Sequence, residues 1–137
     1  ARLNFKPVRD WHYSFAANYT LQQALNNDKT SAEYENEIPY TPKNFASLNF
    51  FASYKSLSFA YNAMFSDTRY NTVYNSAGLL LPKWNTQDVL LGYELNHKKQ
   101  NWKLTLELNN LFNQQYQIVA YYPMPGRNCK IGIQISI

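Results

Sequence analysis

Apolar and polar side chains alternate along most of this chain. From Trp11 to Leu21, for example, every second side chain is apolar or aromatic, and most of the side chains between them are polar. Successive side chains of a β-strand point to opposite faces, whereas a helix would place its apolar residues three and four positions apart. The repeat of two therefore predicts strands with one apolar and one polar face, and we expect an all-β protein.

Seven segments carry this repeat, and the connections between them differ in length. The apolar sets are Leu3 and Phe5; Trp11, Tyr13, Phe15, Ala17, Tyr19 and Leu21; Ala46, Leu48, Phe50, Ala52 and Tyr54; Leu57, Phe59, Tyr61, Ala63 and Phe65; Val89, Leu91, Tyr93 and Leu95; Trp102, Leu104, Leu106 and Leu108; and Cys129, Ile131, Ile133, Ile135 and Ile137. Short connections lie at Val8 to Asp10, at Lys55 and Ser56, and around Lys98 and Lys99; long ones run from about Gln23 to Lys43, Asp67 to Asn85, and Asn110 to Arg127. Short turns that alternate with long loops predict an antiparallel up-and-down meander of about seven long strands.

The residue spacing across each short turn supports these hairpins. A hairpin is stable only when its turn brings the apolar residues of both strands to the same face. The expected cross-strand partners include Phe5 with Tyr13, Ala52 with Phe59, Leu95 with Trp102, and Glu94 with Lys103. All three short turns meet this condition, and the last pair sets opposite charges against each other on the polar face.

The polar face of these strands carries few charges. It is built mainly from Ser, Asn, Thr and Gly, which suit the lining of a wet lumen better than an exterior in bulk water. Aromatic residues, which favour membrane interfaces, lie near the ends of the apolar stripes at Trp11, Tyr19, Tyr54, Phe65 and Trp102. Most segments also reach the roughly 9 to 11 residues that a tilted membrane strand needs. We therefore expect a membrane β-barrel; the alternative is a soluble sandwich or lipocalin-like barrel with an aromatic core.

Composition excludes several other classes of protein. The chain has 137 residues, one cysteine and a net charge of +4 from scattered Lys and Arg, so an internal disulfide is excluded and nucleic-acid binding has little support. No run of roughly 18 apolar residues is present, which excludes a membrane-spanning helix. No catalytic triad, phosphate-binding loop or carboxylate cluster occurs, and neither His12 nor His97 has a partner at metal-ligand spacing. We expect no enzyme activity, no metal and no cofactor.

Seven strands do not close a bacterial barrel. Single-chain bacterial barrels have an even number, because the first and last strands must pair antiparallel. If the last strand ends on the periplasmic side, the short turns are periplasmic and the long loops are extracellular. We therefore expect residues 1–137 to be the C-terminal part of a larger barrel domain.

Three short strings in the sequence resemble a known family. IPYTPKN (residues 38–44) leads into a strand, NLFNQQY (110–116) follows a strand, and PMPGRN (123–128) leads into the final strand. In this order they resemble the C-terminal barrel of TonB-dependent outer-membrane receptors, and the likeness extends over nearly the whole chain from about Trp11. The chain differs from the family at Ile137, where these proteins usually end in Phe.

The resemblance implies a barrel of about 22 strands in the outer membrane of a Gram-negative bacterium, with an N-terminal plug and most of the wall outside this chain. It implies active uptake of a scarce ligand, such as a ferric siderophore or cobalamin. The partners would be outer-membrane lipid, the TonB complex and the small-molecule ligand. A passive porin, or a structural or adhesive barrel, is the alternative that the residues leave open.

Ligand contacts in this part of the chain should come from the long loops. The candidates are Tyr70, Tyr74, Tyr121 and Tyr122, which offer stacking and hydroxyl groups, and Arg69 and Arg127, which offer charge to an anionic chelate. The alternative is that these aromatics form the outer girdle or pack loop against loop.

On the polar face, we expect Glu94, Lys103, Glu107 and Lys130 to pair across the lumen wall and to contact a plug, with a role in the transport path as the alternative. We expect Asn110 to cap backbone groups of a turn and Gly126 to permit a tight backbone entry to the last strand.

Overall fold

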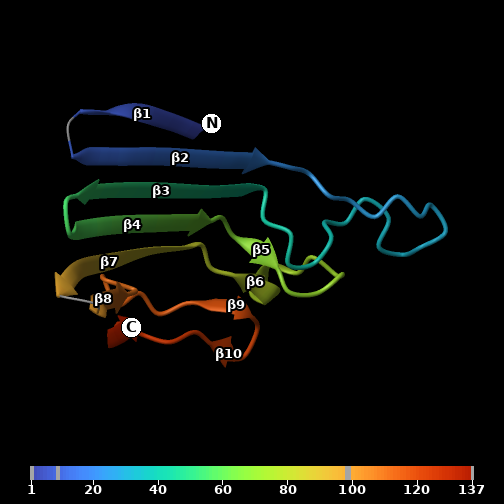
Figure 1. Ribbon diagram of the computed structural model, residues 1–137. Coiled ribbons are helices and arrows are strands. Elements are labelled where there is room, and N and C mark those ends of the chain that lie inside the picture. The colour runs from blue at the N-terminus through green and yellow to red at the C-terminus, as the bar shows by residue number, and fades with distance from the viewer. Residues whose placement is uncertain (1, 9, 98–99, 137) are drawn as a thin grey trace.

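Long antiparallel strands dominate the computed structural model, which describes residues 2–8, 10–97 and 100–136. The elements are β1 (Arg2–Val8), β2 (Trp11–Leu21), β3 (Asn44–Tyr54), β4 (Leu57–Ser66), β5 (Arg69–Tyr70), the 3-10 helix η1 (Ala77–Leu79), β6 (Leu80–Leu81), β7 (Trp84–His97), β8 (Gln100–Asn109), β9 (Gln117–Val119), β10 (Tyr122–Pro123) and β11 (Asn128–Ser136). Within the described residues, seven strands form one sheet in the order β1-β2-β3-β4-β7-β8-β11. Short turns join the strands at one end of this sheet and long loops at the other (Figure 1). The predicted up-and-down meander is therefore confirmed.

The cross-strand registers match those predicted from the sequence. The observed partners include Phe5 with Tyr13, Ala52 with Phe59, Leu95 with Trp102, and Glu94 with Lys103. The turn residues Arg9, Lys98 and Lys99, and the last residue Ile137, lie outside the described residues. The pairs β5-β6 and β9-β10 form two small hairpins inside the long loops. Alternation does not predict these hairpins, because strands of two or three residues are too short to show a repeat.

The strand β7 begins earlier than the apolar repeat predicts. The repeat starts at Val89 and the sequence predicts a loop up to Asn85, but β7 begins at Trp84 and is 14 residues long. Asn85 and Gln87 occupy positions of the apolar face, where their amides interrupt the pattern. Trp84, on the opposite face, is buried and its ring lies 4.8 Å from that of Tyr116. Contacts made by the folded chain therefore decide this end of β7.

The sheet leaves its apolar face open. Ile131 and Ile133 on this face are 79% and 64% exposed. Among the described residues, the only buried hydrophobic side chains are Leu81 and Trp84, and both belong to the long-loop end. An apolar face exposed along whole strands favours contact with lipid over the packed interior of a soluble sandwich. Within the same residues, no helix has the length and apolar character needed to cross a membrane.

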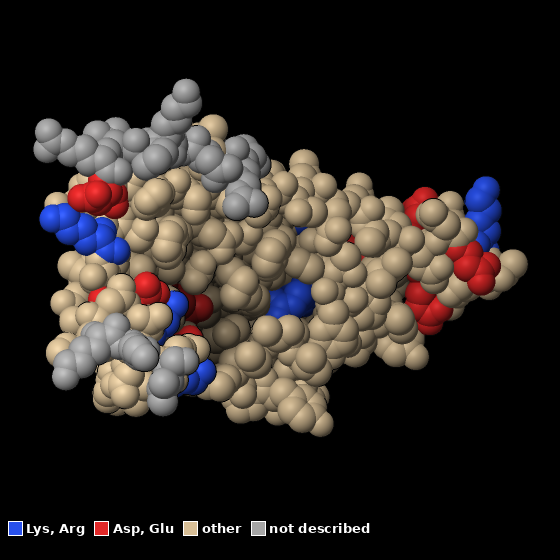
Figure 2. Space-filling model, in the orientation of Figure 1, with Lys and Arg blue, Asp and Glu red and all other residues tan. Residues whose placement is uncertain are grey.

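Aromatic side chains lie at both ends of the apolar face. At the short-turn end, Trp11 stacks on Tyr54 with ring centroids 4.6 Å apart. At the long-loop end, Tyr19 and Phe65 belong to one cross-strand row through Ala46. Figure 2 shows a face on which Lys, Arg, Asp and Glu lie mainly toward the short-turn end and at the tip of the loop after β2. Two aromatic levels with an apolar band between them are typical of membrane strands.

Candidate functional site at the long-loop rim

Three long loops meet at one end of the sheet, which we call the long-loop rim. The first loop comprises residues 22–43, the second residues 67–83 and the third residues 110–127. All three lie opposite the short turns (Figure 1). Hydrogen bonds join the first loop to the second and the second to the third. The rim is therefore a connected layer and not three independent loops.

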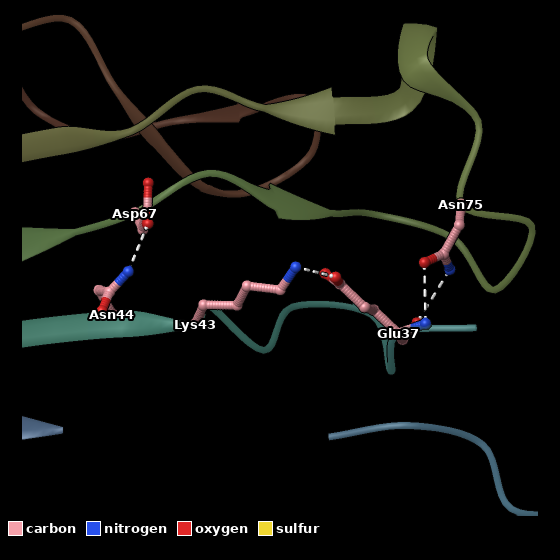
Figure 3. Close-up of polar contacts among 5 residues, drawn as sticks. All are labelled: Glu37, Lys43, Asn44, Asp67 and Asn75. Carbon is pink, nitrogen blue, oxygen red and sulfur yellow. Dashed lines mark hydrogen bonds and ion pairs between the residues drawn. The ribbon is translucent and has the colours of Figure 1, made fainter. Parts of the chain in front are cut away.

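Asn75 and Glu37 join the first and second loops (Figure 3). The N–H of Glu37 donates to Asn75 Oδ1 at 2.8 Å, and Asn75 Nδ2 donates back to the Glu37 carbonyl at 2.9 Å. The N–H of Tyr40 donates to the Tyr70 carbonyl at 2.8 Å. Asn75 has a φ of 49°, in the left-handed region that Asn tolerates better than most residues. A side-chain amide thus takes the place of a strand partner where no regular ladder forms.

Asn44, which follows the first loop, contacts Asp67 at the start of the second, and an ion pair closes the first loop on itself (Figure 3). Lys43 forms an ion pair with Glu37, and Asn44 Nδ2 donates to Asp67 Oδ2 at 2.8 Å. The hydrogen bonds from Asn44 and from the Thr68 N–H lower the pKa of the Asp67 carboxyl. The hydrogen bond to Glu37 raises the pKa of Lys43. Both groups are therefore charged at neutral pH, when these contacts are strongest.

Arg69 joins the second loop to the third. Its side chain is buried, and Nη2 donates to the carbonyl oxygens of Gln117 at 2.7 Å and Ile118 at 3.0 Å. Burial lowers the pKa of the guanidinium, but arginine stays charged at neutral pH. Its charge is thus directed at two backbone carbonyls of β9. Contact between Arg69 and an anionic ligand stays a prediction.

Asn110 organises the third loop, in agreement with its predicted capping role. It is buried and has a φ of 51°. Its Oδ1 accepts the Gln114 N–H at 2.8 Å, and its Nδ2 donates to the carbonyls of Gln114 at 2.9 Å and Pro125 at 3.2 Å. One side chain therefore closes the turn after β8 and binds it to the segment before β11. This contact gives a physical reason for the joint presence of the NLFNQQY and PMPGRN strings.

The same two strings also meet at Asn113 and Gly126. Asn113 Oδ1 accepts the N–H of Arg127 at 2.9 Å. A Cβ atom on Gly126 would lie 2.8 Å from that oxygen, so a larger residue at this position would crowd the Asn113 side chain. Tyr116 completes the arrangement by packing its ring on Trp84 of β7. These residues are structural, and they fix the third loop relative to the sheet.

The third loop covers the polar face near the rim and leaves a hollow beneath it. Ser66 and Thr86 on this face are almost fully buried. The hollow has a volume of about 440 Å³, and Asp88, Tyr116 and Lys130 contribute to its lining. Asp88 Oδ1 accepts the N–H of Asn110 at 2.8 Å. The hollow therefore opens on the side where a barrel of this sheet would have its lumen.

A second hollow of about 400 Å³ lies between the second and third loops. Residues 79–82 form an apolar wall, and Gln115, Gln117 and Tyr121 offer amide and phenol groups on the other side. None of the described Lys, Arg, Asp and Glu residues lines this hollow. Neutral hydrogen-bonding groups beside an apolar wall suit a flat or aromatic part of a small molecule. We call this space the inter-loop hollow.

The structure separates the tyrosines predicted as ligand contacts. Tyr121 lines the inter-loop hollow and is 86% exposed. Tyr122 and Tyr74 are also exposed but do not line this hollow, and Tyr70 is half-buried in β5. Arg127 is exposed in the third loop. The ligand roles of all five residues stay predictions, and Tyr121 has the most favourable position for one.

The four charged residues predicted for the polar face form two cross-strand pairs. Lys103 Nζ lies 3.3 Å from Glu94 Oε1, and Lys130 Nζ lies 3.4 Å from Glu107 Oε2. These side chains are partly exposed, so each pair contributes only about 0 to 1 kcal/mol. The predicted pairing is confirmed, and contact with a plug stays a prediction.

Sequence reasoning did not single out three residues of the inter-loop hollow. Asn71, Gln115 and Gln117 carry neither charge nor an aromatic ring, and they lie in segments without a repeat. Gln115 lies inside the NLFNQQY string and Gln117 follows it directly, which was the available signal for the two glutamines. Among the residues that the structure describes, no group of three or more His, Cys, Asp and Glu side chains is placed to hold a metal ion.

Known proteins are similar to this chain in sequence pattern and in fold. A family model described as TonB dependent receptor-like, beta-barrel, matches residues 1–111. The structure resembles that of the ferric citrate transporter FecA in the unliganded form, with a TM-score of 0.77 and 19% identity over 90% of this chain and 21% of that chain. It also resembles the siderophore receptor PiuA from Acinetobacter baumannii, with a TM-score of 0.69 and 25% identity over 95% of this chain and 20% of that one. The chain thus spans about one fifth of the length of these two proteins.

Proposed function

Because the chain belongs to the TonB dependent receptor-like, beta-barrel family, we propose that it forms part of the wall and rim of an outer-membrane receptor for active uptake of a scarce small molecule. The family match carries this proposal. The remaining wall, a plug and the segment that engages TonB would come from other parts of the parent protein. An enzyme activity is not part of the proposed role.

The two faces and the two ends of the sheet set its orientation in this proposal. The apolar face meets lipid and the polar face lines the lumen, as in other outer-membrane barrels. Such barrels have short periplasmic turns and longer extracellular loops. The long-loop rim is therefore the extracellular end, where a ligand arrives. The Glu94–Lys103 pair lies toward the periplasmic end, where it is placed to contact a plug.

We propose a ferric chelate of the siderophore class as the ligand, in line with the ligands named for the two similar proteins. The inter-loop hollow supplies Tyr121 and Gln117 for the organic part of the chelate. Arg127 is the exposed cation of the third loop and suits a negatively charged chelate. Cobalamin is the alternative ligand, and the uptake experiment separates the two.

Uptake by the full-length receptor tests the proposal. The receptor is expressed in cells that lack their own receptors, and entry of radioactive ferric chelates and of labelled cobalamin is compared with and without TonB. We expect uptake of a ferric chelate that requires TonB. Entry that is equal without TonB would show a passive channel and refute active transport.

A single tyrosine tests the inter-loop hollow. A Tyr121→Ala receptor should bind the ferric chelate about tenfold more weakly, because a stacked aromatic contact is worth roughly 0.5 to 1.5 kcal/mol beyond its buried area. Tyr34→Ala is the matched control, since Tyr34 is exposed on the first loop and does not line the hollow. Equal affinities of the two variants for the ferric chelate in a tryptophan-quenching titration would show that Tyr121 does not contact the ligand.

A further inference from the structure

Two short hairpins form the walls of the inter-loop hollow (Figure 1). The hairpin β5-β6, with the 3-10 helix η1 between its strands, supplies one wall, and the hairpin β9-β10 of the third loop supplies the other. The volume of about 400 Å³ lies at the lower end of the roughly 300 to 1,000 Å³ of pockets that hold whole drug-sized ligands. The hollow therefore suits one arm of a large chelate, and the chemistry of its two walls decides which arm it accepts.

The polar groups that a ligand can reach in this hollow are neutral. Gln117 Oε1 accepts the Tyr121 N–H at 2.9 Å, so a ligand must use the Gln117 Nε2, which is a donor. Tyr121 offers its phenol hydroxyl, and the exposed Gln115 offers its amide. The other wall, residues 79–82, is apolar. An uncharged arm with a carbonyl oxygen and a flat apolar body satisfies both walls.

The cations of the second and third loops do not reach the hollow. None of Arg69, Lys83 and Arg127 lines it. The Arg69 guanidinium is 4% exposed and donates to the carbonyls of Gln117 and Ile118, whose dipoles compensate its charge. A carboxylate that entered the hollow would lose water without gaining an ionic partner.

We propose that the inter-loop hollow selects chelates by an uncharged arm, an acyl or aryl amide, and disfavours chelates whose outer groups are carboxylates. This inference rests on the proposed uptake of a ferric chelate and names the kind of chelate. Gln117 determines the specificity, because its Nε2 donates to the arm carbonyl and its neutral amide gives a carboxylate no opposite charge.

A matched pair of chelates tests the selection. Both are ferric trihydroxamates with one pendant arm, which ends in a benzamide in the first chelate and in a benzoate in the second. The metal centre is the same, so the comparison isolates the arm. In a quenching titration at neutral pH, the full-length receptor should bind the benzamide chelate at least about tenfold more tightly, because an unpaired charge loses more hydration than an amide. Equal affinities, or tighter binding of the benzoate chelate, would overturn the inference.

A cation placed in the hollow provides the second measurement. In a Gln117→Lys receptor the ammonium group can pair with the benzoate, so the preference for the benzamide chelate should fall at least about tenfold. Ile118→Lys is the matched control. It adds the same charge one residue along β9, at a side chain that is 43% exposed and does not line the hollow. The control should keep the wild-type preference, and an equal loss of preference in both variants would contradict the role of Gln117.

Uptake assays separate this inference from the proposed transport. A preference for the benzamide chelate in binding, without TonB-dependent uptake, would support the inference and refute active transport. TonB-dependent uptake of both chelates, bound with equal affinity, would do the reverse. Binding of neither chelate would overturn the inference, whereas TonB-dependent entry of labelled cobalamin would still uphold active transport. Circular dichroism confirms that the β-sheet of each variant is formed, and the wild-type comparison of the two chelates does not depend on the variants.

Discussion

Arg69 provides a quantitative test of the idea that the rim is one connected layer. Its Nη2 makes two charge-assisted hydrogen bonds, to the carbonyls of Gln117 and Ile118, from a side chain that is only 4% exposed. Such bonds contribute roughly 1.5 to 3 kcal/mol each, and part of that gain is offset by the burial of the charge. Arg69→Met keeps much of the packing but removes both donors. The free energy that keeps the two loops closed should therefore fall by about 2 to 4 kcal/mol.

Hydrogen exchange of the full-length receptor measures this change. Since about 1.4 kcal/mol corresponds to a factor of ten, amides of β5, β6 and β9 should exchange about 30 to 700 times faster in the Arg69→Met receptor. Arg127→Met is the matched control, because Arg127 is an exposed cation of the same rim. Its effect should be less than about threefold. If the two variants exchange alike, the buried guanidinium does not hold the loops together.

Three further predictions concern the residues that shape the rim. Asn110→Ala should destabilise the third loop by about 3 kcal/mol, because it removes the side-chain hydrogen bonds and strains alanine at a φ of 51°. Asn110→Gly should cost about 1 kcal/mol less, since glycine adopts this φ without strain. Limited proteolysis of the third loop would contradict this prediction if it ranked the two variants in the opposite order. Gly126→Ala should displace Asn113 Oδ1 from the Arg127 N–H and weaken the same loop by roughly 1 kcal/mol, seen as faster exchange of that one amide, and an unchanged rate would show that the loop adjusts. Hydrogen bonds lower the pKa of Asp67, so its stabilisation of the loop base should be complete above the ordinary pKa of 3.8 and should be lost as the pH falls through the lower pKa of the folded protein. Hydrogen exchange at the loop base should therefore become faster in acid, and Asp67→Asn should abolish this acid dependence. An equal acid dependence in both receptors would exclude Asp67 as its source.

The strands and their faces could be predicted from the sequence because the physics of alternation is local. Side-chain direction changes at every residue of a strand, so the apolar set of β8, from Trp102 to Leu108, already shows which side of the strand is apolar. Parity across a short turn then selects the register, since a slip of one residue would bring polar side chains to the apolar face. This reasoning failed at the start of β7. There, two amides interrupt the pattern and burial of Trp84 under the third loop maintains the strand.

The rim could be predicted only in part. The capping role of Asn110 is local, because Gln114 is four residues away, and the sequence string indicates it. The bonds from Arg69 to β9 and from Asn75 to Glu37 join residues 48 and 38 positions apart, in segments without any repeat. Side-chain type suggested that Arg69 would face a ligand. Its observed partners are backbone carbonyls, and only the path of the folded loops could place them there.

The amino-acid sequence by itself determined that this chain forms long antiparallel strands with an apolar and a polar face, because each strand carries that information in its own spacing. Tertiary structure decided which loop contacts which, where the hollows lie and how the alanines of three strands align into a groove on the apolar face. Ala46 and Ala63 are unremarkable in their separate segments. Cross-strand pairing places them on either side of Leu48 and Phe65, and the shape of the surface follows from that pairing.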